Sequence, residues 1–163
     1  MIRLVVESAL KSKADEVVVV LGWQADKIRK VLADLPCRLV LNVNYEKGQS
    51  SSVKAGLREV GNSAQAILVL PGDVAKIDSR SINLVIEEHY RSSSPIIISA
   101  HNGRLGHPIL LSRGLFTEIE QIDEETHGLK AVVKRHGSEI RLVECGSESV
   151  LRDVDVPEDL EQL

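Results

Sequence analysis

Asp73 is the residue whose type and position best suit chemistry. It follows the apolar run 66–70 and the pair Pro71-Gly72. Such a run is typical of a strand buried in a parallel sheet, and in these sheets ligands bind beyond the carboxyl ends of the strands. A carboxylate there suits Mg²⁺, which prefers oxygen ligands and substrate phosphates, and Gly72 lets the backbone approach a ligand closely. The alternative is that Asp73 belongs to a turn or caps the next helix.

A second acidic cluster lies near the carboxyl end, in the run 152–159. Alternation along an extended chain places Asp153 and Asp155 on one side. Two carboxylates on one face repel each other unless a cation or a base lies between them. The alternative is that Asp155 caps a helix opened by Pro157, an explanation that fits Asp153 less well.

The polar loop 44–52 could bring backbone N–H groups and hydroxyls to the start of a helix. Helix N-termini attract anions and polar ligand edges, and glycine at position 48 permits close approach. On local sequence alone an ordinary helix capped by one of the serines at 50–52 is the stronger reading.

His107 precedes Pro108 between two predicted strands, and a residue before proline is held extended. Its ring could bind a ligand, although a lone histidine is more often a surface residue. The other four histidines form no metal-like spacing, and no GxSxG elbow supports a serine hydrolase.

Strands and helices alternate from the start of the chain. Helical spacing of apolar residues predicts helices over 2–13 and 25–32, from about 50 to 60 and over 79–90, with others near 113–121 and 127–136 and a short one after Pro157. Short β-branched runs predict strands over 16–22, 37–41, 66–70, 96–99 and 108–111, near 139–143 and near 150–154. This order is typical of one α/β domain, 1–163, with a mostly parallel sheet between helical layers.

Composition excludes several classes of protein. The chain has 163 residues, a formal net charge of -4 and no basic tract, so we expect no nucleic-acid partner. No apolar stretch approaches the roughly 20 residues that span a bilayer, and Met1-Ile2-Arg3 does not open a signal peptide. We therefore expect a cytoplasmic protein without a membrane partner. The two cysteines form no CxxC pair, which argues against zinc or a redox dithiol.

Five segments together resemble the molybdenum cofactor nucleotidyltransferases, and most of all the cytidylyltransferase (MocA-like) branch of the MobA-like NTP transferases. The matching runs, in family order, are 18–22, Asn44-Tyr45-Glu46-Lys47-Gly48-Gln49-Ser50-Ser51-Ser52-Val53-Lys54-Ala55-Gly56-Leu57, Leu68-Val69-Leu70-Pro71-Gly72-Asp73, Gly103-Arg104-Leu105-Gly106-His107-Pro108 and Asp153-Val154-Asp155-Val156-Pro157-Glu158-Asp159-Leu160. Each motif alone is weak, but five in order across nearly the whole chain are fairly specific.

The resemblance implies a three-layer α/β fold of the nucleotide-diphospho-sugar transferase type. It implies that Asp73 binds the Mg²⁺ that holds the NTP phosphates, with Asp153, Asp155 or both completing the metal site. Gly48, Ser51 and Ser52 would lie near the base or ribose. Beside the acceptor, a molybdopterin-type molecule, would lie Arg104, Gly106, His107 and Pro108. The implied reaction is attack by a pterin phosphate on the α-phosphate of the NTP, with CTP favoured over GTP, and release of pyrophosphate.

Two departures from the family pattern matter. Val74-Ala75 stand where the family usually has Gln-Pro or Met-Pro after the metal aspartate. In addition, the family begins with a strand and a glycine-rich loop, Leu-Ala-Ala-Gly-x-Ser-x-Arg-Met-Gly, that grips the triphosphate, and this sequence has no such loop. Each lost charge-assisted contact is worth about 1.5–3 kcal/mol, so we expect little turnover by this chain alone. A natural start and a shortened gene both fit the residues.

The strand missing from the family pattern would lie between strands 16–21 and 66–70. Unpaired strand edges attract partner strands, so we expect these two strands to pair directly or a second copy to fill the place, as in a homodimer.

Two other functions remain open. The chain could be a non-catalytic nucleotide-binding or assembly module of the same fold. It could also be a sugar-phosphate nucleotidyltransferase, although Gly106-His107-Pro108 and the acidic tail resemble the molybdopterin group more closely.

Overall fold

The structure is a computed structural model that describes residues 1–60, 63–74 and 76–151. Its helices are α1 (Ile2–Leu10), α2 (Ala25–Val31), α3 (Gln49–Val60), α4 (Ser79–Ser92), α5 (Phe116–Ile119) and α6 (Leu129–Arg135). Its strands are β1 (Val18–Leu21), β2 (Arg38–Leu41), β3 (Ala66–Val69), β4 (Ile96–His101), β5 (Arg104–Ser112) and β6 (Ile140–Glu144). The α/β fold predicted from the alternation of apolar patterns is confirmed.

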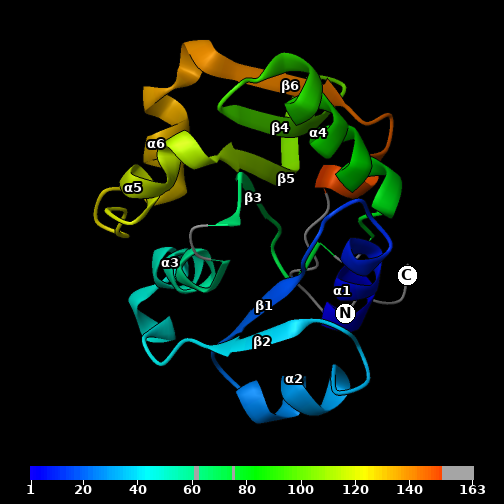
Figure 1. Cartoon of the computed structure of the whole chain (residues 1–163), viewed down its shortest axis with the longest axis vertical. Helices are drawn as coiled ribbons and strands as arrows, with labels where there is room; N and C mark the ends of the chain where they lie inside the picture. The colour runs from blue at the N-terminus through cyan, green and yellow to red at the C-terminus, as the bar shows by residue number, and fades with distance from the viewer. Residues whose placement is uncertain (61–62, 75, 152–163) are drawn as a thin grey trace.

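The strands form two sheets. The larger has the order β3-β5-β4-β6, in which β4 and β6 are parallel and β5 runs against both of its neighbours. The smaller is the parallel pair β1-β2. Figure 1 shows the small sheet with α2 in the lower part of the molecule and the large sheet in the upper part.

Strand β4 is the centre of the larger core, which explains its unbroken apolar run. Ile97 packs with Val85 of α4 on one face of the sheet. Ile96 and Ile98 pack on the other face, in a second cluster that includes Ile119 of α5 and contributions from α3 and α6. The sheet therefore lies between two helical layers, as the three-layer prediction requires.

The small sheet has its own core, and α1 joins it to the larger one. Val6 of α1 packs with Val19 and Leu21 of β1, whereas its neighbour Val5 packs into the core under α4. A methyl group at Gly56 of α3 would lie 3.2 Å from Val20 Cγ2 of β1. Two helices thus hold the sheets together where no strand pairing does.

Hydrogen bonds at both ends of α3 show that this helix runs antiparallel to β2. At the end of β2, the Asn42 side-chain amide donates to Ser51 and Ser52 Oγ at the start of α3. At the start of β2, Arg38 Nη1 donates to the Glu59 carbonyl at the end of α3. Strand β3 therefore begins where β2 began, and the carboxyl ends of β1, β2 and β3 face one edge.

Strands β1 and β3 belong to different sheets, so the prediction that they pair directly is wrong for the described chain. Strand β1 pairs only with β2, and β3 only with β5. All four residues of β3 are only half-buried, although this is the most apolar strand by sequence. The alternative prediction, in which a second copy fills the place, stays a prediction.

Two predicted elements differ in the structure. Residues Glu148–Leu151 form a 3-10 turn where the sequence predicts a strand near 150–154, and positions 152–154 lie outside the described residues. The helix predicted over 113–121 is a 3-10 turn, Arg113–Leu115, followed by the four-residue α5. In the described ranges, no helix has the length and apolar character needed to cross a bilayer.

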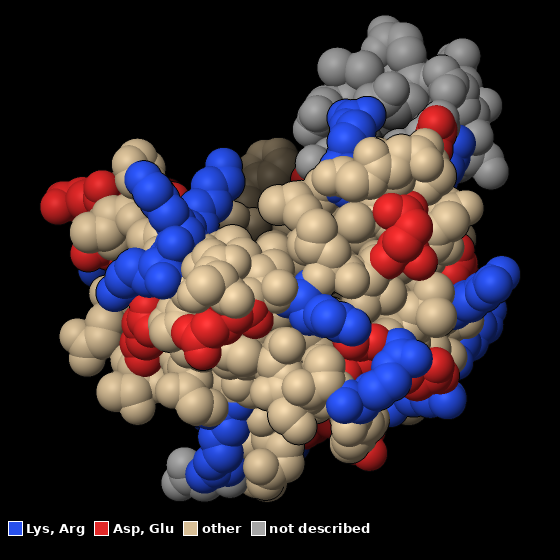
Figure 2. Space-filling model, turned by 90° about the horizontal axis from the view of Figure 1, so that it is seen from above, with Lys and Arg blue, Asp and Glu red and all other residues tan. Residues whose placement is uncertain are grey.

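Figure 2 shows basic and acidic side chains interspersed over the upper face of the molecule. Ion pairs also bridge separate elements, among them Arg58–Glu120 and Arg135–Glu118.

Candidate functional site

Asp73 lies in the turn that follows β3, at the carboxyl edge of the sheet, as the sequence predicts. The next residue, Val74, is completely buried and Ile77 nearly so, which anchors the segment in the core under α4. The Oδ1 atom of Asp73 is buried and has no hydrogen-bond partner among the described residues. A buried carboxylate oxygen without a donor is costly, and a cation or a ligand donor would offset that cost.

The alternative role of Asp73, as the cap of the next helix, is taken by another residue. Helix α4 begins at Ser79, and its N-cap Asp78 accepts a hydrogen bond from the Ser81 backbone N–H at 2.7 Å. Asp73 therefore does not cap α4, which was the alternative role that its sequence position allowed.

Gly72 lies against the start of α1. A methyl group at this position would lie 2.8 Å from Ile2 Cδ1, a separation that requires the neighbour to move. The start of α1 thus forms one wall beside the turn of Asp73.

The register of β3 and β5 brings the segment 104–108 to the same edge. Val69 at the end of β3 pairs with Ile109, so the residues preceding Ile109 continue beyond the point where β3 ends. The His107-Pro108 peptide bond is cis; Arg104 is exposed, Gly106 and His107 are half-buried and Pro108 is buried. The turn of Asp73 and the segment 104–108 therefore lie at the same edge of the sheet.

Gly106 is the point at which the end of the described chain meets this edge. A methyl group there would lie 2.2 Å from the Val150 carbonyl oxygen and 3.2 Å from Leu151 Cδ2. Only glycine permits this approach. Asp153 and Asp155, the other predicted metal ligands, lie outside the described residues.

The segment predicted to meet the nucleotide, with Gly48, Ser51 and Ser52, lies at the carboxyl end of β2. Ser51 Oγ donates to the carbonyl oxygens of Asn44 and Gly48 at 2.9 and 2.8 Å, while its lone pairs accept from the buried Asn42 amide. Asn42 was not predicted as a site residue. A polar residue directly after an apolar strand was the available signal.

Glu124 is the second residue that sequence reasoning missed. Its Oε1 accepts the Ser50 backbone N–H at 2.6 Å, and its side chain fills the space beside Gly48, whose φ is +90°. The hydrogen bonds from Ser50 lower the pKa of the Glu124 carboxyl. The start of α3 is therefore capped by a distant carboxylate and not by one of its own serines.

A cavity of about 380 Å³ opens between the end of β2 and the outer face of α3. Its polar lining includes Asn42, Asn44 and Ser51, together with the cations of Lys47, Lys54 and Arg58. Lys54 Nζ donates to the Ile122 carbonyl at 2.7 Å and Arg58 pairs with Glu120. These two cations hold the loop after α5 in place.

A divalent metal would find one suitable oxygen in the described part of the site. The buried Asp73 Oδ1 has the chemistry that Mg²⁺ and Mn²⁺ prefer. No group of three His, Cys, Asp or Glu side chains with metal-binding geometry occurs within residues 1–60, 63–74 and 76–151. Asp73 therefore fits a metal that takes its remaining ligands from phosphates, water or residues elsewhere.

The chain is similar to several known proteins. A family model for the MobA-like NTP transferase domain matches residues 1–140. Nicotine blue oxidoreductase of Paenarthrobacter nicotinovorans is 26% identical over 162 residues, which cover 96% of this chain and 79% of that protein.

Solved structures share the fold over nearly the whole chain. A nucleotidyl transferase from Methanothermobacter thermautotroptrophicus superposes with a TM-score of 0.82 at 22% identity, covering 99% of this chain and 77% of that one. A Mycobacterium tuberculosis protein solved as a complex with manganese gives 0.76 at 23% identity, with 99% and 84% covered. These likenesses confirm the predicted nucleotide-diphospho-sugar transferase type of fold. Because the family match spans 140 of the 163 residues, the chain belongs to the MobA-like NTP transferase domain family.

Proposed function

We propose that this domain binds a nucleoside triphosphate with Mg²⁺ at the edge formed by Asp73 and transfers its nucleotide to a molybdopterin-type acceptor. The observation that carries the proposal is the buried, unpartnered Oδ1 of Asp73 at the carboxyl edge of the sheet. The family match and the solved relatives support it. One of these relatives is molybdopterin-guanine dinucleotide biosynthesis protein A from Archaeoglobus fulgidus, with a TM-score of 0.66 at 14% identity.

The proposed reaction is an in-line displacement at the α-phosphorus. A phosphate oxygen of the acceptor forms the new bond, the bond to the bridging oxygen breaks, and pyrophosphate leaves with the electron pair. A bound Mg²⁺ would neutralise phosphate charge and orient the triphosphate. Asp73 holds that charge in place, and the segment of Arg104, Gly106, His107 and Pro108 shapes the acceptor side.

The proposal favours CTP over GTP and the cytidylyltransferase (MocA-like) branch, from the sequence resemblance. It also holds that this chain alone turns over slowly, because the resemblance implies a glycine-rich phosphate-gripping loop that the sequence does not contain. Binding should survive that loss better than turnover does, since the metal carboxylate remains. Asp153 and Asp155 would add further ligands.

Calorimetry with CTP and GTP, with and without Mg²⁺, tests the proposal. We expect Mg²⁺-dependent binding that Asp73→Asn reduces at least tenfold, because the isosteric amide removes the charge. Asp15→Asn, an exposed carboxylate before β1, is the matched control and should leave binding unchanged. Absence of binding to either nucleotide in the wild type would refute the transferase and favour a non-catalytic module.

The acceptor is tested by pyrophosphate release with molybdopterin and with a sugar 1-phosphate. Release with the pterin alone, even if slow, supports the proposed acceptor. Release with the sugar phosphate alone would replace it with a sugar-phosphate nucleotidyltransferase.

A further inference from the structure

Trp23 is a large apolar side chain left open to solvent at the edge that carries Asp73. It is the single tryptophan of the chain, and 69% of it is exposed. It directly follows β1, whose carboxyl end lies at the same edge as those of β2 and β3. Nothing in the sequence motifs or in the proposed chemistry so far uses it.

The turn that presents Trp23 is rigid. On one side Leu21 is 1% exposed and Gly22 lies against Tyr45, where a methyl group would be 2.6 Å from Tyr45 Cβ. On the other side Gln24 has a left-handed backbone, with φ of 55°, and its carbonyl accepts the N–H groups of Lys27 and Ile28 in α2. The backbone on both sides of Trp23 is therefore held by packing and hydrogen bonds, and the side chain between them is exposed.

The turn of Trp23 and the turn of Asp73 share a neighbour. Ile2 packs into the cluster that contains Leu21 and Ala25, the residues on either side of the Trp23 turn. The same side chain lies against Gly72, next to Asp73. Ile2, the first residue of α1, thus contacts the surroundings of both turns.

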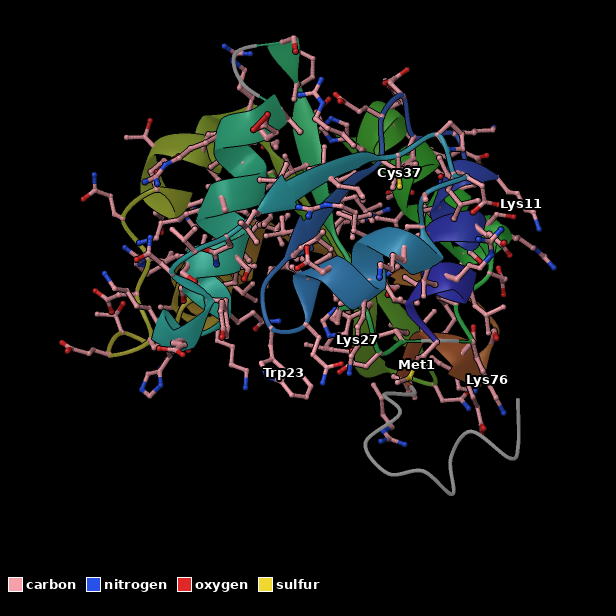
Figure 3. All side chains as sticks on the ribbon, turned by 90° about the horizontal axis from the view of Figure 1, so that it is seen from below. Met1, Lys11, Trp23, Lys27, Cys37 and Lys76 are labelled. Atoms are coloured by element: carbon pink, nitrogen blue, oxygen red, sulfur yellow. The ribbon has the colours of Figure 1, made fainter. Side chains whose placement is uncertain are left out.

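Figure 3 shows Trp23 on one rim of the molecule with Met1, Lys27 and Lys76. Lys27 lies in the first turn of α2, four residues after Trp23, is exposed, and forms no ion pair with any residue that the structure describes. An aromatic face with a neighbouring cation matches a ligand that combines a flat ring with phosphates.

We propose that Trp23 is the stacking platform for the planar heterocycle of the phosphorylated ligand bound at this edge, with Lys27 beside it to meet a phosphate. The ring is a nucleobase or a pterin; both present a flat π-face. Stacking on tryptophan is tolerant of base identity, because every base has a π-face. The inference rests on the proposed function, in which Asp73 holds the phosphates through Mg²⁺. It adds Trp23 as the residue that holds the ring.

The single tryptophan makes the inference directly measurable. Ligands are added in the presence of Mg²⁺ while indole fluorescence is followed, with calorimetry in parallel. CTP, GTP and a pterin phosphate carry the ring, and inorganic triphosphate carries only the charges. We expect saturable quenching by one or more ring-bearing ligands and none by triphosphate; quenching by nucleotides or by the pterin alone identifies which ring Trp23 holds.

Substitutions separate the ring contact from the phosphate contact. Trp23→Ala should weaken the ring-bearing ligand about 5- to 160-fold, the range found when a stacked aromatic is removed, and leave triphosphate binding unchanged. Trp23→Phe should restore most of the affinity. Asp73→Asn should weaken both ligands. Tyr90→Ala, which removes an aromatic residue of 78% exposure near the end of α4, is the control and should change nothing.

Two results overturn the inference in distinguishable ways. If CTP, GTP or the pterin binds by calorimetry with no change in fluorescence and equal affinity for Trp23→Ala, stacking is refuted and the proposed function stands. If the wild type binds none of these ligands, the proposed function and the inference fall together.

Discussion

The carboxylate of Glu124 accepts the backbone N–H of Ser50 at 2.6 Å, across 74 residues of sequence. This contact fixes the start of α3 to the loop after α5. It also closes the space beside Gly48, where a methyl group would lie 2.3 Å from Glu124 Cγ. The segment predicted to meet the nucleotide is therefore held from outside its own sequence neighbourhood.

Glu124→Ala should destabilise the protein by about 1 kcal/mol, the usual cost of losing a helix N-cap acceptor. The Ser50 N–H would lose its partner and the start of α3 would fray. Urea unfolding followed by circular dichroism measures the change. Glu125→Ala removes an adjacent exposed carboxylate and should shift stability by less than half as much. Equal effects of the two substitutions would contradict the capping role.

His136 should make stability depend on pH in the neutral range. Its Nδ1 lies 2.8 Å from Glu139 and its Nε2 lies 2.8 Å from Glu118, and these carboxylates raise the pKa of the imidazole above 6.5. A raised folded pKa gives stability that is fully present below the unfolded value and is lost as pH rises through the folded one. Arg135 also pairs with Glu118 at 2.9 Å, so Glu118 keeps one partner when His136 loses its proton.

We therefore expect His136→Gln to lower the melting temperature clearly at pH 6 and little at pH 9. Melting curves over that range measure the difference from wild type. The control is His127→Asn, at an exposed histidine whose φ of 66° asparagine tolerates. A His136→Gln effect that is constant with pH would show that shape, and not charge, matters at this position.

Patterns of apolar residues predicted most of the fold. The β-branched run at Ile96, Ile97 and Ile98 alternates between two buried clusters, so its strand and its central place follow from local sequence. The position of Asp73 was also predictable, because a residue that follows an apolar strand lies at the carboxyl edge of the sheet; its role there stays a prediction.

What local sequence could not supply are contacts made across the fold. The serines at 50–52 are good caps by type. In the structure Glu124 takes that role, because the tertiary fold places its carboxylate against the Ser50 backbone N–H. The sequence left two interpretations of Asp73 open, and the hydrogen bond of Asp78 at the start of α4 removes the capping one. The sequence analysis also did not predict two separate sheets. Helices α1 and α3 pack against both sheets, so β1 and β3 are held in the fold without pairing with each other.

Gly106→Ala should disturb both stability and ligand binding. The added methyl group would lie 2.2 Å from the Val150 carbonyl oxygen, and backbone atoms cannot yield as a flexible side chain does. Overpacking of this kind costs about 1–3 kcal/mol. Since the displaced turn leads to Asp153, we also expect weaker Mg²⁺-dependent nucleotide binding.

Gly114→Ala provides the control for that substitution, because a methyl group at Gly114 would meet nothing within 4 Å. Chemical unfolding and calorimetry of the two variants give the comparison. If Gly106→Ala is as stable as Gly114→Ala, the close approach of the two segments is not a feature of the folded protein.

The buried carboxylate of Glu88 links α4 to β6 and should contribute to the loss of stability at acid pH. Arg91 and Arg141 both bind it, Arg141 at 2.9 Å, and these bonds, that of Arg91 first, lower the pKa of the carboxyl below 4.5. A lowered folded pKa gives stability that is present above the unfolded value and is lost as pH falls through the folded one. Glu88→Gln should therefore lower the melting temperature by several degrees at pH 7, and the difference from wild type should shrink towards pH 3.

A double-mutant cycle tests the link between Glu88 and Arg141. Because partners in one ion-pair network are not additive, Arg141→Ala should cost less stability in the Glu88→Gln background than in the wild type. Arg80→Ala, which removes an exposed arginine on the same helix, should cost the same in either background. Full additivity of Glu88→Gln and Arg141→Ala would mean that the two residues stabilise the fold independently, and the link between α4 and β6 would have to come from the apolar core alone.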